Sequence, residues 1–125
     1  MSATILHVED NPSNRMIIRD LLQFQGFRVV EVMDGEEALG AAERERPNLI
    51  LMDIQLPRIS GLEAARRIKA RADLRHIPIV ALTSFALSGD DKKAFTAGCD
   101  AYLAKPYKPR ELLQLIQELL RQQKS

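Results

Sequence analysis

Cysteine, charge of one sign and long apolar runs are all scarce in this 125-residue sequence. The single Cys99 has no partner for an intrachain disulfide, which fits a reducing compartment and favours a small buried residue over a reactive thiol. The 18 Lys and Arg against 17 Asp and Glu give a net charge of +1, so neither direct nucleic-acid binding nor membrane binding is expected. No apolar run approaches a membrane span and the N-terminus lacks a signal-peptide pattern, so we expect a cytoplasmic protein with one domain over residues 1–125.

Short apolar segments alternate with amphipathic segments along the chain. The apolar run 49–52 is bounded by Pro47 and by a Pro- and Gly-bearing loop, which is typical of a strand buried on both faces. Segments with apolar residues at helical spacing follow the strands, and Pro12 and Gly26 suit the beginning and the end of the first of them. We predict strands at 4–8, 28–33, 48–53, 77–82 and 100–104, and helices at 12–25, 34–46, 61–72, 88–98 and 109–123.

Strands that alternate with helices predict an α/β fold with a parallel sheet covered on both faces. The segments 28–33 and 100–104 are the more polar ones and belong at the edges, with the other three strands inside. Right-handed crossovers then favour the order 2-1-3-4-5, a doubly wound, flavodoxin-like sheet of five strands with five helices. In this order the residues that follow strands one and three face the same crevice.

Acidic residues and one lysine follow the predicted strands at this edge of the sheet. Glu9 and Asp10 follow the first strand, Asp53 ends the third, and Lys105 follows the fifth. Three carboxylates at close range stay ionised together only when a cation joins them, and oxygen ligands at an open edge suit Mg²⁺. A carboxylate can also attack phosphorus to form an acyl phosphate, and Lys105 and the hydroxyl of Thr83 can stabilise the charge of a phosphoryl group. The sequence therefore predicts a site for a cation and a transferable anionic group.

These residues, in this order, resemble the motif set of two-component response-regulator receiver domains, the CheY-like family, over essentially the whole chain. The resemblance rests on Glu9-Asp10, on Asp53 with the Pro57 and Gly61 that follow it, on Thr83, and on Lys105-Pro106. The stretches 8–15, 49–62, 76–80 and 84–90 are most similar to receivers of hybrid histidine kinases and of stand-alone regulators of the DivK type.

The resemblance implies a role for each of these residues. Asp53 would be the phosphoacceptor, and Thr83 and Lys105 would contact its phosphoryl group. The ligands implied for Mg²⁺ are Glu9, Asp10, Asp53 and the backbone carbonyl of Gln55. Tyr102 matches the aromatic residue that turns inward when Thr83 moves, while packing alone also accounts for a tyrosine on an edge strand.

The implied function is that of a phosphorylation switch and not of an enzyme, because such a domain catalyses only its own phosphotransfer and dephosphorylation. A sensor histidine kinase or a histidine phosphotransfer protein would supply the phosphoryl group. The added charge would alter a surface formed by the fourth helix, the fifth strand and the fifth helix, which binds a downstream effector protein. We expect a monomer, and a weak dimer stays an open alternative.

The same residues bear on three alternative classes of protein. A haloacid-dehalogenase-type phosphatase places its nucleophilic Asp after the first strand with a second acid two residues on, where this chain has Pro12. A flavin-binding electron carrier needs a phosphate loop after the first strand, and Glu9 and Asp10 would repel a phosphate there. A pseudo-receiver that binds partners without phosphorylation stays open.

His7 lies within the first strand, where we expect it to pack or to contact a neighbour.

Overall fold

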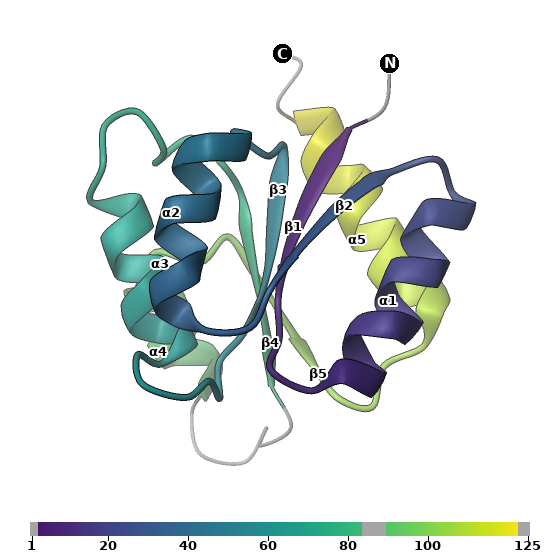
Figure 1. Cartoon of the computed structure of the whole chain (residues 1–125), viewed down its shortest axis with the longest axis horizontal. Coiled ribbons are helices and arrows are strands. Elements are labelled where there is room, and N and C mark those ends of the chain that lie inside the picture. Colours follow the sequence, from purple (N-terminus) through teal and green to yellow (C-terminus); the bar gives the residue numbers. More distant parts are fainter. Residues whose placement is uncertain (1–2, 84–89, 123–125) are drawn as a thin grey trace.

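The computed structural model describes residues 3–83 and 90–122, and within them one parallel sheet lies between two layers of helices (Figure 1). The strands are β1 (Thr4–Val8), β2 (Arg28–Val32), β3 (Leu49–Asp53), β4 (Ile79–Thr83) and β5 (Ala101–Ala104). The helices are α1 (Pro12–Phe24), α2 (Gly35–Glu45), α3 (Gly61–Lys69), α4 (Asp90–Thr96) and α5 (Pro109–Gln122). The strand order β2-β1-β3-β4-β5 confirms the doubly wound fold predicted from the sequence.

The predicted edge strands are the edges of the sheet, while several element boundaries differ from the prediction by one to three residues. β2 and β5 lie at the edges, while β3 and β4 are buried along their whole length. β4 begins at Ile79 because the amide of Ile77 closes a turn onto the carbonyl of Leu74, and Pro78 has no amide to donate to a neighbouring strand. α3 ends at Lys69, where the chain turns back toward β4.

Apolar side chains form a separate core on each face of the sheet. The first core joins the sheet to α2, α3 and α4, and the first two of these helices contribute mainly alanines to it, which lets them lie close to the strands. The second core joins the opposite face to α1 and α5 through Ile18, Leu22, Leu112 and Ile116. Figure 1 shows the same division, with α1 and α5 on one side of the sheet. Since both faces are covered, the ends of the strands are where polar side chains can gather.

Two expectations drawn from composition concern Cys99 and membrane-spanning helices. Cys99 is buried beside the first core, and burial, followed by the nearby Asp100 carboxylate, raises the pKa of its thiol to about 11. The thiol therefore stays protonated, as a small buried residue should. None of the helices within residues 3–83 and 90–122 is long and apolar enough to cross a bilayer.

Helix caps and one glycine hold the loops at the carboxyl edge of the sheet, which is the lower edge in Figure 1. The side chains of Asn11 and Ser60 accept hydrogen bonds from amides in the first turns of α1 and α3. A Cβ atom built on Gly61 would lie 2.0 Å from the carbonyl oxygen of Asp53, an approach that only glycine permits. The start of α3 is thus fastened directly against the end of β3.

At the opposite edge, Lys69 joins three segments that are distant in sequence. Its Nζ donates to the carbonyl oxygens of Arg75 and Ile77 at 3.0 and 2.8 Å and to Asp100 Oδ2 at 2.8 Å. The same Asp100 oxygen accepts the amide of Ile79 at 2.9 Å. The ammonium therefore ties the end of α3 to the beginnings of β4 and β5.

Replacing Lys69 with Met keeps most of the stem and removes the ammonium. Because the side chain is only 16% exposed, we expect the free energy of unfolding, measured by urea titration, to fall by about 1–3 kcal/mol. Arg67→Met on the same helix is the matched control, since it removes an exposed pair with Glu63 worth less than about 1 kcal/mol. Equal losses in the two variants would contradict this account of Lys69.

Candidate functional site

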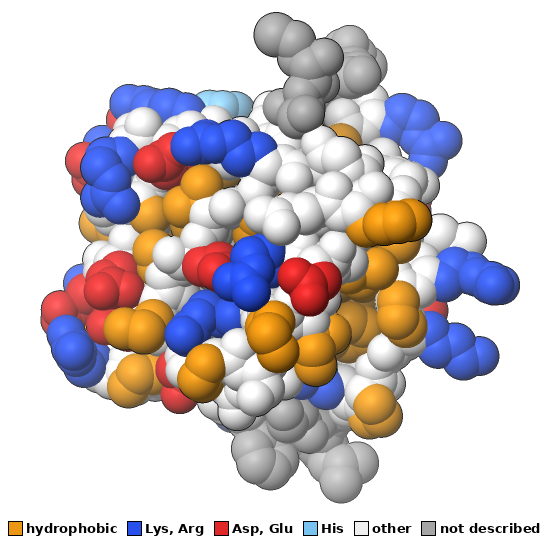
Figure 2. Space-filling view, turned by 45° about the vertical axis from the view of Figure 1, so that its right-hand side comes forward, with side chains coloured by type: hydrophobic (Ala, Val, Ile, Leu, Met, Phe, Trp, Pro, Cys, Tyr) orange, Lys and Arg blue, Asp and Glu red, His pale blue; other side chains and the backbone are white. Residues whose placement is uncertain are grey.

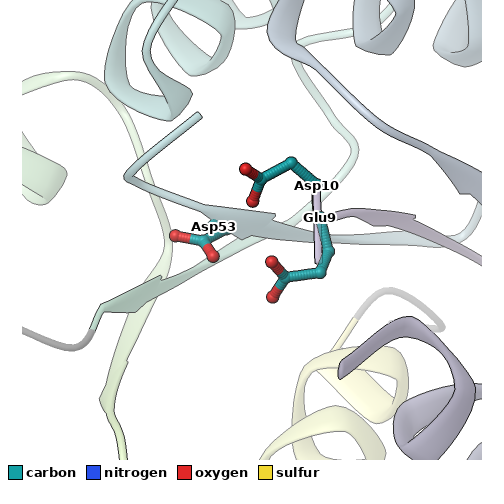
Figure 3. Close-up of side chains that lie close together, drawn as sticks. All are labelled: Glu9, Asp10 and Asp53. Carbon is teal, nitrogen blue, oxygen red and sulfur yellow. The ribbon is translucent and has the colours of Figure 1, made fainter. Parts of the chain in front are cut away.

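Three carboxylates meet beyond the carboxyl ends of β1 and β3 (Figure 3). Glu9 and Asp10 follow β1, and Asp53 ends the neighbouring β3, whose Met52 is paired in register with Val8. One carboxylate oxygen from each of the three acids lies within 4.8 Å of the others. Glu9 and Asp53 are buried, with 2% and 5% exposure, whereas Asp10 is exposed. The structure therefore brings together the three acids that the sequence placed at this edge.

Contacts from α1, its N-cap and the end of β2 hold Glu9 in place. Glu9 Oε2 accepts the amide of Asn11 at 3.2 Å, and Oε1 lies 3.5 Å from Asn14 Nδ2. Arg15 Nη1 donates to the Glu9 carbonyl at 2.9 Å, and the Glu9 amide donates to the Val32 carbonyl at 3.0 Å. Side chain and backbone are both fixed, so the carboxylate is oriented toward Asp53 before any ligand arrives.

Lys105 reaches across the site from the loop after β5. Its Nζ lies 3.1 Å from Glu9 Oε1 and 3.3 Å from Asp53 Oδ2. Its amide donates to the Thr83 carbonyl at 2.7 Å, which fastens the end of β5 to the end of β4. Burial opposes the charge on the ammonium, but the carboxylates of Asp53 and Glu9 outweigh that effect and raise the pKa of Lys105. The site thus holds one fixed cation among three acids.

The donor set fits a small divalent cation. One ammonium cannot neutralise three carboxylates, so the cluster keeps an excess of negative charge directed at one space. The oxygens are hard ligands at an open edge, which suits Mg²⁺ with part of its water shell retained. The amide of Gln55 donates to Asp53 Oδ1 at 2.8 Å, which places the Gln55 peptide beside the same carboxylate. The three carboxylates expected from the sequence to hold Mg²⁺ therefore lie around one space, while the part expected of the Gln55 carbonyl stays a prediction.

Thr83 and Tyr102 lie on the two strands next to this cluster. Thr83 ends β4 and is fully buried, and its neighbour Leu82 is paired in register with Asp53. Tyr102 lies on β5 opposite Ala81, and its half-buried ring packs against the core under α2, α3 and α4. This packing shows where the ring lies, and the inward movement expected from the sequence stays a prediction. The predicted start of the fourth helix at residue 88 lies outside the described residues.

The structure gives a role to one polar residue that the sequence reasoning did not single out, Asp34, and an unexpected environment to a second, His7. Asp34 is buried at the tip of β2, where it accepts the Glu37 amide at 2.9 Å and lies 3.5 Å from Arg58 Nη1. Arg58 has a φ of 64°, a left-handed conformation in the loop that follows Asp53. An Asp followed three residues later by Glu is the signal that could have identified Asp34 as a helix cap.

The environment of His7 differs from that of a histidine that simply packs in a strand. The side chain is fully buried in β1, and neither ring nitrogen has a hydrogen-bond partner among the described residues. Burial, followed by the charges of Lys105 and Arg15, lowers the pKa of His7 to about 3. The ring is therefore neutral at physiological pH.

Comparison with known proteins agrees with this geometry. The model of the response regulator receiver domain family matches residues 5–117. The polar-differentiation response regulator DivK of Brucella anthropi is 42% identical over 120 residues, which cover 96% of this chain and 98% of the relative. The receiver domain of sensor histidine kinase PA1611 from Pseudomonas aeruginosa, crystallised with magnesium in its active site cleft, superposes with a TM-score of 0.90 at 44% identity, covering 96% and 98% of the chains. The chemotaxis response regulator CheY4 of Vibrio cholerae superposes with a TM-score of 0.88 at 28% identity, covering 95% and 99%.

Proposed function

Because the chain belongs to the response regulator receiver domain family, we propose that it is a phosphorylation switch whose phosphoacceptor is Asp53. The observation that carries the proposal is the position of Lys105, whose ammonium contacts both Asp53 and Glu9 inside the acidic cluster. A lysine held between a buried acid and a second acid that could bind a cation is placed to stabilise the negative charge of a phosphoryl group transferred to the first acid.

The covalent step is transfer from a phosphohistidine of a sensor histidine kinase or a histidine phosphotransfer protein. An oxygen of Asp53 forms a bond to phosphorus while the phosphorus–nitrogen bond breaks, and the electron pair of that bond stays on the donor imidazole. The Gln55 amide, 2.8 Å from Asp53 Oδ1, keeps the carboxylate oriented. After transfer, the phosphoryl oxygens become the partners of the Lys105 ammonium and of the Thr83 hydroxyl.

The residues that would hold Mg²⁺ are Glu9, Asp10, Asp53 and the backbone carbonyl of Gln55. The bound cation supplies positive charge that offsets the repulsion between the carboxylates and the incoming phosphoryl group. Asp10 is the exposed member of the set and is therefore the ligand that incoming cations reach first. The magnesium in the receiver domain of PA1611, which is 44% identical to this chain, supports this choice of cation.

The output proposed for the switch is a change of the surface formed by α4, β5 and α5. The Lys105 amide is already bonded to the Thr83 carbonyl, so a movement of Thr83 toward the phosphoryl group is passed directly to the end of β5. Tyr102 lies on that strand, two positions from its end. A downstream effector protein binds this surface. The chain acts as a monomer in the cytoplasm, and it catalyses only its own phosphorylation and dephosphorylation.

Removal of divalent cations is expected to stop phosphorylation. The chain is incubated with acetyl phosphate in Mg²⁺ or in excess chelator, and the phosphoryl adduct is measured by intact mass. We expect the rate of labelling to fall by roughly 100-fold or more in chelator, because the acids then repel the donor, and to recover when Mg²⁺ is restored. Circular dichroism checks that the fold persists without the cation. Undiminished labelling in excess chelator would exclude the metal role.

A further inference from the structure

A cleft lies beside α1 on the face of the sheet that α1 and α5 cover. Its volume is about 340 Å³, within the range of small-molecule sites. Its apolar wall is formed by Ile17, Ile18, Leu21, Pro106, Tyr107 and Pro109. Hydrophobic side chains also reach the surface on the side of the molecule where α1 lies (Figure 2), and Ile17, one of the lining residues, is 62% exposed.

His7 supplies an unmatched polar group to this apolar lining. It is one of the residues that bound the cleft, it is fully buried, and both of its ring nitrogens lack a hydrogen-bond partner among the described residues. A neutral imidazole carries one donor and one acceptor, and leaving them unmet in an apolar environment costs free energy. Because the ring is fully buried, the hydrogen bond requires lining side chains such as the half-buried Leu21 and Tyr107 to turn aside when a ligand enters.

The charged residues that line the cleft favour a neutral occupant. Lys105 and Glu9 both line it, and they are paired with each other at 3.1 Å. An anionic ligand would meet the Glu9 carboxylate and a cationic ligand would meet the Lys105 ammonium, so neither gains a free counter-charge.

We propose that this cleft binds a small, flat, neutral aromatic molecule whose one polar ring group forms a hydrogen bond with His7. The apolar wall would contact the aromatic ring of the ligand, and the unmatched imidazole would bond its polar group. The paired charges of Lys105 and Glu9 favour a ligand without net charge. This binding does not rest on the phosphorylation proposed above, because it belongs to the unmodified chain without a cation.

Indole and indene provide the test, since they share one shape and only indole carries an N–H group. Each is titrated into ¹⁵N-labelled protein without Mg²⁺ or phosphodonor, and the backbone amide and His7 ring signals are followed by NMR. We expect saturable binding of both, with indole bound about tenfold more tightly and shifting the His7 ring nitrogens. In His7→Leu the two affinities should become equal.

Two exposed residues of α1 give a matched pair of controls. Ile17→Gln, in the wall of the cleft, should weaken both ligands, whereas Phe24→Gln, which is 87% exposed and outside the cleft, should leave them unchanged. Absence of saturable binding, equal affinities in the parent chain, or equal effects of the two glutamines would each overturn the proposal. Phosphorylation of Asp53 is measured separately, so any of these outcomes leaves that proposal unaffected.

Discussion

Asp53→Asn should carry no phosphoryl group after incubation with acetyl phosphate and Mg²⁺, while the parent chain gains one. The amide has no anionic oxygen to attack phosphorus, so the adduct on intact protein should disappear completely. The change is nearly isosteric, and the Asn carbonyl can still accept the Gln55 amide that now lies 2.8 Å from Asp53 Oδ1. The loss should therefore come from the chemistry and not from unfolding, which a urea titration of the variant can verify.

The matched control is Asp20→Asn, an acid on α1 whose side chain is 71% exposed and loosely paired with Arg19 at 3.8 Å. It removes the same charge from the chain and should leave labelling unchanged. If the adduct persisted on Asp53→Asn, the phosphoacceptor would have to be another residue, and peptide mapping would identify it. If neither the parent nor the control were labelled, the pseudo-receiver alternative would gain support.

The arrangement of the strands could be predicted because each strand carries a local signal. The apolar run 49–52 could be satisfied only between two other strands, and the glutamate in 28–33 is acceptable only where one side of a strand is open. Once the order is set, the residues that follow β1 and β3 must be neighbours. Glu9, Asp10 and Asp53 were therefore within reach of sequence reasoning.

Other features depend on contacts between distant segments and could not be predicted. The bonds from Lys69 to Asp100 join positions 31 residues apart, and nothing near either residue indicates the partner. The left-handed conformation of Arg58 occurs in a loop whose next residue, Ile59, lies against Gly35 at the start of α2, a contact between distant segments. Similarly, a histidine in an apolar strand can be matched or unmatched, and only the surrounding side chains of α1 and the loop after β5 decide which.

His7 should also make the fold sensitive to acid. Its pKa is 6.5 in an exposed setting and about 3 in the folded chain, so below pH 6.5 the unfolded state binds a proton that the folded state does not. Above pH 6.5 the imidazole is neutral in both states and does not reduce the free energy of unfolding. As the pH falls from 6.5 toward 3, proton binding by the unfolded state lowers the free energy of unfolding progressively. Each pKa unit corresponds to about 1.4 kcal/mol, so this single group should remove about 5 kcal/mol from the free energy of unfolding over that range.

The charged neighbours of His7 support the direction of this effect. Lys105 and Arg15 both disfavour a second positive charge. Glu31, paired in register with His7 on β2, could favour that charge, but its Oε1 is already engaged by Arg19 at 3.2 Å. In the folded state, the attraction of a protonated ring to Glu31 is thus weakened by Arg19, while Lys105 and Arg15 repel the ring.

His7→Leu is the variant that isolates the contribution of this histidine. Leucine fills a similar volume and leaves no unmatched polar atom, so stability at pH 7 should stay the same or rise by about 1–3 kcal/mol. The other titratable groups behave alike in the parent chain and in His7→Leu. The difference between the free energies of unfolding of the two chains, measured by urea titration from pH 7 to pH 3, therefore reports on His7 alone. That difference should widen by about 1.4 kcal/mol per pH unit below 6.5. Parallel stability curves for the two chains would mean that folded His7 finds a partner when it is protonated, and would contradict the neutral, isolated ring from which the acid sensitivity is derived.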